Sequence, residues 1–193
     1  EAIEFDGKRA TGLRSKSGIH DYDEVVVNAD ATWAMKNLIP ANLRRKWSDQ
    51  RIDAKKYSCS TFMLYLGLEG EVDLPHHTIY TSETYRENLE DIGSGRLTDD
   101  ASTYVHNPSR IDSSLAPEGD TSLYVLVPTP NDGGTIDWET AGPALRESTL
   151  DKLGDVFGIP DVRGRIRAER TVTPVDWRNE RINLGATFNL AHG

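Results

Sequence analysis

The feature that most constrains the fold is the segment 57–68, which reads Tyr-Ser-Cys-Ser-Thr-Phe-Met-Leu-Tyr-Leu-Gly-Leu. Side chains of a β-strand point alternately to its two faces. Here bulky apolar groups occupy both, with Leu64 on one face and Met63 and Tyr65 on the other. A strand that is apolar on both faces is typical of the interior of a sheet. The segment therefore predicts a central strand.

Turn and cap signals divide the rest of the chain into short elements. Asp6-Gly7 is a strong hairpin signal between strands at 1–5 and 10–13. Val25-Val-Val27 predicts a strand that is buried on both faces. Asp30 predicts the N-cap of the helix that follows it.

The same signals continue along the chain. Helices are expected at 31–38, 41–53, 82–92, 143–157 and 173–178, and strands at 77–80, 102–106, 123–127 and 165–173. Strands and helices are segregated rather than strictly alternating. This order predicts the α+β fold class, with a mixed, largely antiparallel sheet flanked by helices.

Composition excludes several classes of protein. The 193 residues are 37% hydrophobic and 27% charged, which suits a globular piece with a core. No apolar run approaches the roughly 18 residues of a membrane span. The net charge of −9 argues against a nucleic-acid partner, and the single Cys59 excludes an internal disulfide. We expect Cys59 to be a buried, small apolar residue.

The start of the chain predicts a piece of a longer protein. It opens at Glu1 without an initiator methionine, inside the expected hairpin and without the basic-then-apolar pattern of a signal peptide. A cytosolic setting fits this pattern.

A series of short phrases runs along the chain in a fixed order. They are Val25-Val-Val-Asn-Ala-Asp30, Leu64-Tyr-Leu-Gly-Leu68, Leu74-Pro-His-His-Thr-Ile79, Tyr85-Arg-Glu-Asn-Leu-Glu-Asp-Ile92, the stretch 107–119, Ile136-Asp-Trp138, Thr173-Pro-Val-Asp-Trp-Arg178 and Phe188-Asn-Leu-Ala-His-Gly193. Together they resemble the bacterial phytoene desaturases, a family of FAD-dependent carotenoid dehydrogenases. Each phrase alone is weak, but eight in order make an accidental match improbable.

The resemblance implies a division into domains. Residues 1–35 would be a remnant of the FAD-binding domain, 36–185 the substrate-binding domain, and 186–193 the start of a return segment to the FAD domain. The family's Gly-x-Gly-x-x-Gly loop, which cradles the FAD pyrophosphate, has no match, since Gly93-Ser-Gly95 lacks the third glycine. We therefore expect FAD in the full-length protein, none held by this chain alone, and no activity from this chain alone.

The resemblance also implies the reaction, the dehydrogenation of phytoene to more conjugated carotenes in carotenoid biosynthesis. FAD takes a hydride, and a base or a water chain takes a proton. A polyene has no polar handle and needs a long apolar channel, which the substrate domain would wall. Two alternatives stay open: a sister desaturase of the diapophytoene or hydroxyneurosporene type, or a flavin-free lipid-binding or interaction module.

Glu90 and Asp91 are the candidate acid–base residues. They fall in the phrase at 85–92, where the family's proposed acid–base carboxylate lies. The alternative is a solvated helix face on which Arg86 and Glu90 form an i, i+4 pair.

The candidate contacts to FAD also follow from the resemblance. They are Ala2 and Ile3 on the first strand and Asn28 and Ala29 at the following turn, and their contacts would be made by the backbone.

A basic segment predicts a membrane contact. Arg44, Arg45, Lys46 and Arg51 surround Trp47 on an expected amphipathic helix, which could lie on an anionic surface. With the absence of a membrane span, this predicts a cytoplasmic protein that is peripherally membrane-associated. The alternative is an ordinary solvated helix face.

The histidines predict no metal site. His76 and His77 are adjacent, so a strand would direct them to opposite faces, and no third ligand follows at a useful spacing. His106 and His192 are isolated and are expected to be structural.

Two further groups are expected to be structural. Arg110 and Asp112 could tie their turn by local hydrogen bonds. Asp176, Trp177 and Arg178 resemble a helix start near the domain junction.

Overall fold

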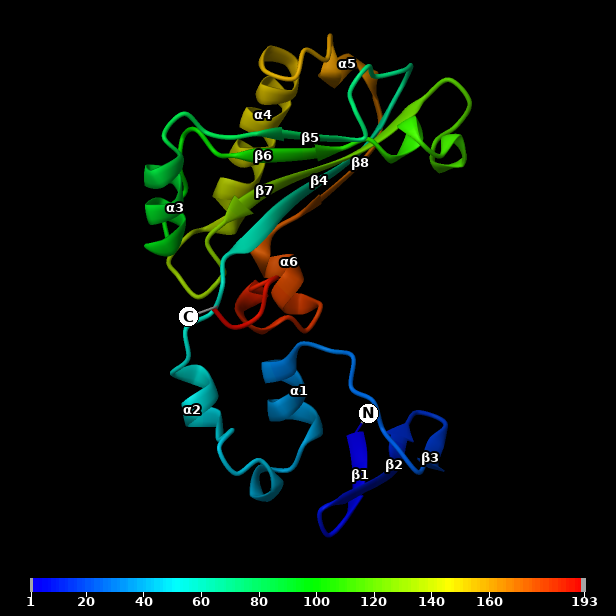
Figure 1. Cartoon of the computed structure of the whole chain (residues 1–193), viewed down its shortest axis with the longest axis vertical. Helices are drawn as coiled ribbons and strands as arrows, with labels where there is room; N and C mark the ends of the chain where they lie inside the picture. Colours follow the sequence, from blue (N-terminus) through cyan, green and yellow to red (C-terminus); the bar gives the residue numbers. More distant parts are fainter. Residues whose placement is uncertain (1, 192–193) are drawn as a thin grey trace.

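The computed structural model describes residues 2–191, which form two sheets joined by helical segments (Figure 1). The first sheet is a three-stranded antiparallel meander of β1 (Ala2–Asp6), β2 (Arg9–Ser15) and β3 (Gly18–Asp21). Gly7 adopts a positive φ of 58° in the first turn, where glycine carries no steric penalty. The expected hairpin is confirmed.

The first helix also follows the prediction. In α1 (Ala31–Leu38) the Asp30 carboxylate accepts a hydrogen bond from the backbone N–H of Trp33 at 2.7 Å. The expected strand at Val25–Val27 is wrong, because no described strand lies beside this segment to share its hydrogen bonds. Val26 is 90% exposed, so its apolar face has no cover among the described residues.

The expected helix at 41–53 is wrong as a single element. The chain forms a 3-10 turn, η1 (Ala41–Leu43), and then a short helix, α2 (Asp49–Asp53). Arg45 between them has a φ of 41°, which breaks the right-handed helix. The Ser48 hydroxyl then caps α2 by accepting from the N–H of Arg51.

The second sheet has five strands in the order β5-β6-β7-β4-β8, and all of its pairs are antiparallel. The strands are β4 (Ser60–Leu68), β5 (His77–Tyr80), β6 (Thr103–His106), β7 (Thr121–Thr129) and β8 (Ile166–Val172). β4 lies between β7 and β8, so the predicted interior strand is confirmed. The α+β class with a largely antiparallel sheet is confirmed as well.

The remaining helices flank this sheet. They are α3 (Tyr85–Gly93), α4 (Trp138–Asp155), α5 (Val162–Arg165) and α6 (Pro174–Asn179), with the 3-10 turns η2 (Pro108–Arg110), η3 (Ser113–Leu115) and η4 (Asn183–Gly185). α4 begins earlier than expected, at Trp138, because the Asp137 side chain caps it. α3 begins later, after Thr84, whose N–H donates to the Ser82 hydroxyl.

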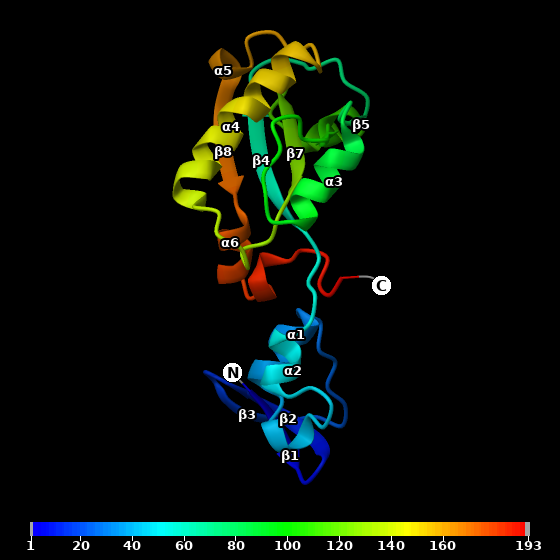
Figure 2. The same ribbon diagram turned by 90° about the vertical axis from the view of Figure 1, so that its left-hand side faces the viewer.

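The core lies between the five-stranded sheet and α4, which crosses one sheet face (Figure 2). Alternate residues of β4 and β7 point toward the helix and are almost fully buried. They pack against the apolar side of α4, and the cluster includes Phe62, Leu64, Leu66, Leu68, Val105, Leu123, Val125, Val127, Leu150 and Leu153. Their close packing is the main stabilising term of this part of the molecule.

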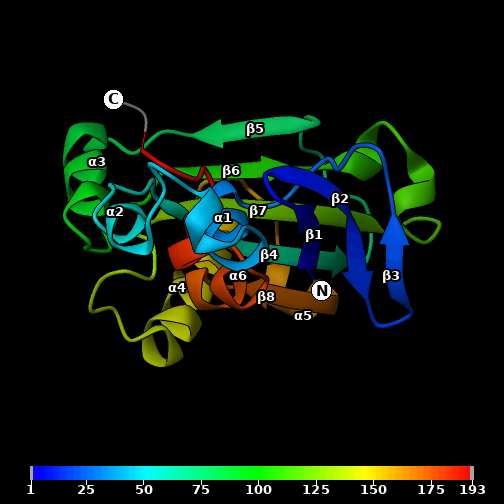
Figure 3. The ribbon, with the colours of Figure 1, turned by 90° about the horizontal axis from the view of Figure 1, so that it is seen from below.

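The opposite sheet face is turned toward residues 2–56. Seen from below, the first sheet and α1 lie in front of the five strands, and α4 lies behind them (Figure 3). α6 packs against β4 and β8 on the same side as α1, at one edge of the sheet. The larger part of this face is therefore covered by no helix that belongs to the described residues.

Two chain segments join the two parts of the molecule side by side. The segment at 186–191 returns along the outgoing segment at 56–58, and an antiparallel bridge pairs Tyr57 with Leu190. The N–H of Ser58 donates to the carbonyl of Asn189 at 2.9 Å, and the N–H of Ala191 donates to that of Lys56 at 3.0 Å. The expected boundary at residues 35 and 36 falls inside α1.

Candidate functional site

The sheet face that points away from α4 is the candidate functional site, and we call it the open face. Strand register places its side chains in two cross-strand rows. The first row is Ile79, Tyr104, Leu126, Met63 and Val172, and the second is His77, His106, Tyr124, Tyr65 and Arg170. Ten side chains from five strands thus form one continuous surface.

The first row is apolar and becomes progressively uncovered across the sheet. Met63 and Val172 are each 4% exposed beside α6, whereas Ile79 at the other edge is 70% exposed. Leu126 and Tyr104 are half-buried between them. Ile79 is in register with Tyr104 and Leu126, so its exposed side chain continues a cross-strand strip and is not an isolated apolar residue.

Aromatic rings dominate the second row. The Tyr124 ring lies 5.9 Å from Tyr65, 5.6 Å from Tyr104 and 5.3 Å from His106, measured between centroids. Burial, followed by the neighbouring Tyr104 and Tyr65, raises the pKa of the Tyr124 phenol. Its hydroxyl therefore stays neutral, and the centre of the face carries no fixed charge.

The structure brings three histidines together at the β5 edge of the open face. His76 and His77 do not point to opposite faces, because His76 precedes the strand, and their ring centroids are 4.0 Å apart. His106 is not isolated, since its Nε2 lies 2.8 Å from Nε2 of His76. Both expectations are wrong: the first because β5 begins at His77, and the second because the pairing of β5 with β6 was not visible in the sequence. His192 lies outside the described residues.

The candidate acid–base pair lies on α3, beside the ends of the strands and not on the open face (Figure 1). Asp91 is half-buried, and its Oδ1 accepts from Nε and Nη2 of Arg96 at 3.0 and 2.6 Å. Glu90 is exposed. Within residues 2–191, neither Arg86 nor any other cation forms an ion pair with Glu90.

The candidate flavin contacts lie in the lower part of the molecule. Ile3 is 9% exposed and Ala2 is half-buried on β1, whereas Asn28 and Ala29 are exposed before α1. No Gly-x-Gly-x-x-Gly turn leads into a helix among residues 2–191, and the Asp30 carboxylate already caps the N-terminus of α1. These residues therefore do not fit a dinucleotide pyrophosphate by themselves.

The basic segment differs from the expected amphipathic helix. Arg44 is 7% exposed and forms an ion pair with Asp49, so it cannot reach a surface outside the molecule. Arg45, Lys46 and Arg51 are exposed. None of the helices formed by the described residues is both long and apolar enough to cross a membrane.

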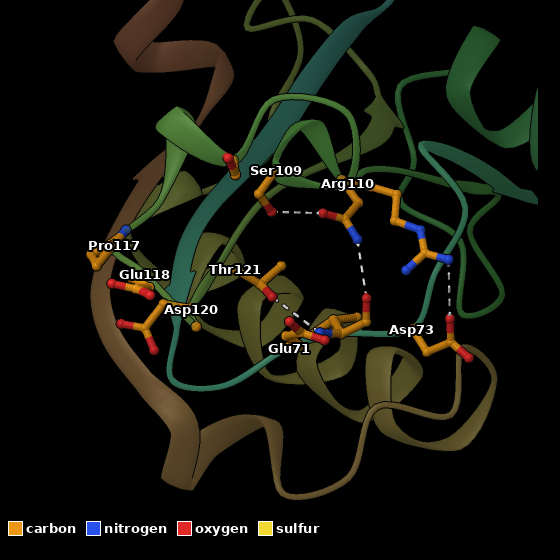
Figure 4. A pocket seen from close by; sticks show the side chains of 12 residues that line it. Glu71, Asp73, Ser109, Arg110, Pro117, Glu118, Asp120 and Thr121 are labelled. Atoms are coloured by element: carbon orange, nitrogen blue, oxygen red, sulfur yellow. Dashed lines mark hydrogen bonds and ion pairs between the residues drawn. The ribbon is translucent and has the colours of Figure 1, made fainter.

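A cavity of about 710 Å³ lies between the segment 71–73 and the segment 107–121 (Figure 4). Its labelled lining is dominated by carboxylates, including Glu71, Asp73, Glu118 and Asp120. Such a polar, acidic lining is unsuited to a hydrocarbon. The buried Asn107 holds its wall by donating to the carbonyls of Val72 and Leu74, both at 3.2 Å.

The phrase at 107–119 that contributes this wall makes structural contacts. Asp112 accepts from the N–H and hydroxyl of Ser114 at 3.0 and 2.6 Å, which are local turn bonds. Arg110 instead reaches Asp73 of another loop at 3.7 Å.

The helix start at 173–178 also makes structural contacts. Asp176 completes a capping box with Thr173, and the Trp177 indole donates to the carbonyl of Thr61 at 2.9 Å. Arg178 pairs with Asp132.

Cys59 is half-buried rather than fully buried, and burial raises the pKa of its thiol.

Sequence reasoning missed the tyrosines of the open face. The alternation in β4 placed Met63 and Tyr65 on a common face, which was the available signal. Tyr104 and Tyr124 alternate with Val105 and Val125 in the same way. The cross-strand register that unites them is not readable from any one strand.

Comparison with known proteins gives consistent relatives. The chain is 42% identical over its whole length to a 4,4'-diapophytoene desaturase (4,4'-diapolycopene-forming) from Methylomonas sp, of which it covers 38%. It is 45% identical over its whole length to an all-trans-zeta-carotene desaturase from Myxococcus xanthus, covering 37% of that protein. It is 37% identical over 97% of its length to a neurosporene-forming phytoene desaturase from Rhodobacter capsulatus, again covering 37%.

The fold has a counterpart among solved structures. An oxidoreductase from Methanosarcina mazei superposes with a TM-score of 0.51 at 14% identity, over 88% of this chain and 35% of that one. No family model matches the chain. The chain spans little more than a third of the length of the curated relatives it matches. Along that span its sequence is similar to that of carotenoid desaturases, and the resemblance to the phytoene desaturase family is confirmed.

Proposed function

We propose that the protein containing this chain is an FAD-dependent desaturase of phytoene or a related polyene, and that the open face is one wall of its substrate channel. The observation that carries the proposal is the aromatic and apolar surface on the uncovered side of the sheet, with Ile79 70% exposed. The tyrosines and aliphatic side chains of this surface suit a rigid hydrocarbon, and the exposed Arg170 lies at its β8 edge. The names of the relatives given above state that those proteins desaturate polyenes.

The energetics favour this use of the surface. Each 100 Å² of apolar surface removed from water contributes about 2.5 kcal/mol. A rod-shaped polyene laid along the sheet would cover Tyr65, Tyr124 and Tyr104 together. Burial raises the pKa of the Tyr124 phenol, so a hydrocarbon beside this ring need not desolvate a charge.

FAD would accept the hydride in this reaction. The resemblance assigns the contacts of Ala2, Ile3, Asn28 and Ala29 to this cofactor, and they remain part of the proposal. The pyrophosphate would be held by residues other than 2–191, since these lack its cradle. The domain division at 1–35, 36–185 and 186–193 belongs to the same proposal, and the return of residues 186–191 toward α1 supports it.

Glu90 is the better acid–base candidate of the two carboxylates. Asp91 already forms an ion pair with Arg96. The exposed Glu90 side chain has no such partner within residues 2–191 and can approach another part of the complete protein. Changing Glu90 to Gln should lower kcat at least tenfold. Glu87→Gln on the same exposed helix provides the matched control. Equal activity of the two variants would remove Glu90 from the mechanism.

The proposed activity is tested with the complete gene product in cells that supply phytoene. The expected product is a carotene with more conjugated double bonds, identified by its absorption spectrum after chromatography. Parallel cells that supply 4,4'-diapophytoene distinguish the sister activity. A purified complete protein that binds polyene in vesicles but contains no flavin and forms no product would instead support a lipid-binding module.

A membrane contact is part of the proposal, through Arg45, Lys46 and Arg51. Their charge reversal should reduce sedimentation of the complete protein with vesicles that contain anionic lipid. Charge reversal of the exposed Lys8 and Lys16, in the turns of the first sheet, is the control for a similar change outside the basic segment. Binding that falls equally in both variants, or in neither, would contradict this contact.

A further inference from the structure

Three imidazole rings converge at the β5 edge of the open face. His77 begins β5, His76 precedes it, and His106 ends β6 directly opposite His77 in the strand register. One nitrogen from each ring can be chosen so that all three lie within 4.8 Å of one another. The centroid separations are 4.0 Å for His76 and His77, 4.5 Å for His76 and His106, and 4.9 Å for His77 and His106.

Backbone bonds fix the segment that carries His76. Its carbonyl accepts from the N–H of Asn107 at 2.9 Å. The Asn107 side chain, 1% exposed, also holds the carbonyl of Leu74 two residues earlier. The position of His76 relative to His106 is therefore set by the residue that follows His106, and the rings need no large movement to meet.

The nitrogen positions suit a cation. Nε2 of His76 and Nε2 of His106 lie 2.8 Å apart, so at most one of them can carry a proton between them and the other presents a lone pair. Three nitrogens at the usual zinc distance of about 2.1 Å are roughly 3.4 Å from one another in a tetrahedral site. An opening of the His76–His106 pair by about half an ångström would therefore admit the ion.

A neighbouring tyrosine orients the third ring. Nδ1 of His77 lies 2.5 Å from the hydroxyl of Tyr104. When Nδ1 is the protonated nitrogen, it donates to Tyr104 and Nε2 of His77 presents its lone pair. Metal-binding histidines almost always have such a partner on their second nitrogen. In that tautomer the Tyr104 oxygen accepts from Nδ1, and Nε2 is left for the metal.

The surroundings leave room for a further ligand. His77 is exposed, and His76 and His106 are half-buried. Three protein ligands with one side open to solvent are typical of sites in which water or a substrate completes the coordination. Imidazole ligands without thiolates suit Zn²⁺, Cu²⁺, Ni²⁺ and Co²⁺ better than Ca²⁺ or Mg²⁺.

We propose that His76, His77 and His106 form a binding site for a divalent transition-metal ion of the Zn²⁺ class, with Tyr104 positioning His77. The site does not depend on the desaturase reaction, because it rests on the three rings and their register alone. Without the metal, the same rings form a hydrogen-bonded and stacked cluster.

The test uses the complete gene product without an affinity tag, freed of metal by a chelator and titrated with Co²⁺. The expected result is one equivalent bound with visible d–d absorption, which Zn²⁺ then displaces. His106→Asn and His77→Gln should each remove this absorption. His20→Asn on β3 is the matched control, since it removes a histidine far from the cluster.

A second measurement separates coordination from folding. The exposed His77 can be changed to Gln with little effect on the circular dichroism spectrum, so loss of Co²⁺ binding in that variant reports the ligand itself. Tyr104→Phe should weaken binding by about tenfold to a hundredfold. Absence of d–d absorption in the wild-type protein, or equal binding by the wild-type, His77→Gln and His106→Asn proteins, would overturn the proposal.

Discussion

The two faces of the five-stranded sheet are built from the same strands but differ in chemistry. On the face under α4, the side chains in the middle of β4 and β7 are aliphatic or phenyl groups that are almost fully buried. On the open face, their immediate neighbours in sequence are Met63, Tyr65, Tyr124 and Leu126, and Tyr65 is 36% exposed. The difference teaches that alternate residues of one strand can build a closed core on one face and leave an aromatic surface uncovered on the other.

The largest expected effect lies on the covered face. Leu64→Ala should lower the free energy of unfolding by about 2–5 kcal/mol, because a fully buried leucine leaves a cavity between β4 and α4. Urea denaturation of the complete protein, followed by fluorescence, measures the change. Tyr65→Ala is the matched change on the other face and should cost about 1 kcal/mol or less. Equal losses would show that the two faces do not differ in this way.

The next effect concerns the KM for the polyene, on which Tyr65→Ala should have a larger effect than Leu64→Ala. Tyr65→Ala should raise the KM for a vesicle-dispersed polyene about fivefold to thirtyfold, since an exposed aromatic ring would be lost from the proposed channel. Tyr22→Ala, which removes another half-exposed tyrosine, should leave KM unchanged. A normal KM for the Tyr65 variant would place the polyene elsewhere.

A smaller effect is expected where α6 covers the edge of the open face. Thr173→Ala removes the hydroxyl of the capping box and should destabilise the protein by about 1 kcal/mol. Thr173→Ser retains the hydroxyl and should recover most of this loss. Thermal melting of both variants tests the contribution. If Thr173→Ser is as unstable as Thr173→Ala, the cap is not the cause.

The smallest expected effect on the free energy of unfolding comes from removing an ion pair beside the covered face. Arg146 of α4 donates from Nη2 to Oε2 of Glu169 on β8 at 2.6 Å, and this bond lowers the pKa of the Glu169 carboxyl. A carboxyl with a lowered pKa in the folded state stabilises fully above its unfolded value of about 4.5. This contribution disappears as the pH falls through the lowered pKa.

Glu169→Gln should therefore cost less than about 1 kcal/mol at pH 7, because the pair is partly solvated. Below the lowered pKa the variant and the wild-type protein should be equally stable. Denaturation curves at several pH values measure this convergence. A difference that stays constant as the pH falls below 4.5 would exclude the ion pair as its source.

Local sequence signals predicted those elements whose bonds are local. Asp6-Gly7 predicted the hairpin, Asp30 the N-cap of α1, and the two-sided apolar pattern the interior position of β4. The strand expected at Val25–Val27 was wrong, because a strand needs partners and no local pattern supplies them. The helix at 41–53 was wrong because the left-handed conformation of Arg45 is not encoded by charge or hydrophobicity.

The candidate site was less predictable for a related reason. Its tyrosines and histidines come from strands separated by loops of different lengths. Only the pairing of β5 with β6 brings His77 opposite His106, and a shift by one residue would place them on different faces. The sequence therefore predicted apolar side chains on both faces of β4 but not the residues of other strands that share the open face with them.

The double connection between the two parts of the molecule has a mechanical consequence. A single linker permits one body to swivel freely about the other, whereas two hydrogen-bonded segments side by side resist twisting and permit mainly bending. The side-chain oxygen of Asn189 also accepts from the N–H of Ala31 at 3.4 Å, so the returning segment contacts the start of α1. Arg181, which follows α6, adds a second contact, because its guanidinium lies 5.2 Å from the centroid of the Trp33 ring. Bending at the paired segments 56–58 and 186–191 would change the distance between residues 2–56 and the tyrosines of the open face. It would leave the orientation of the tyrosines within the sheet unchanged.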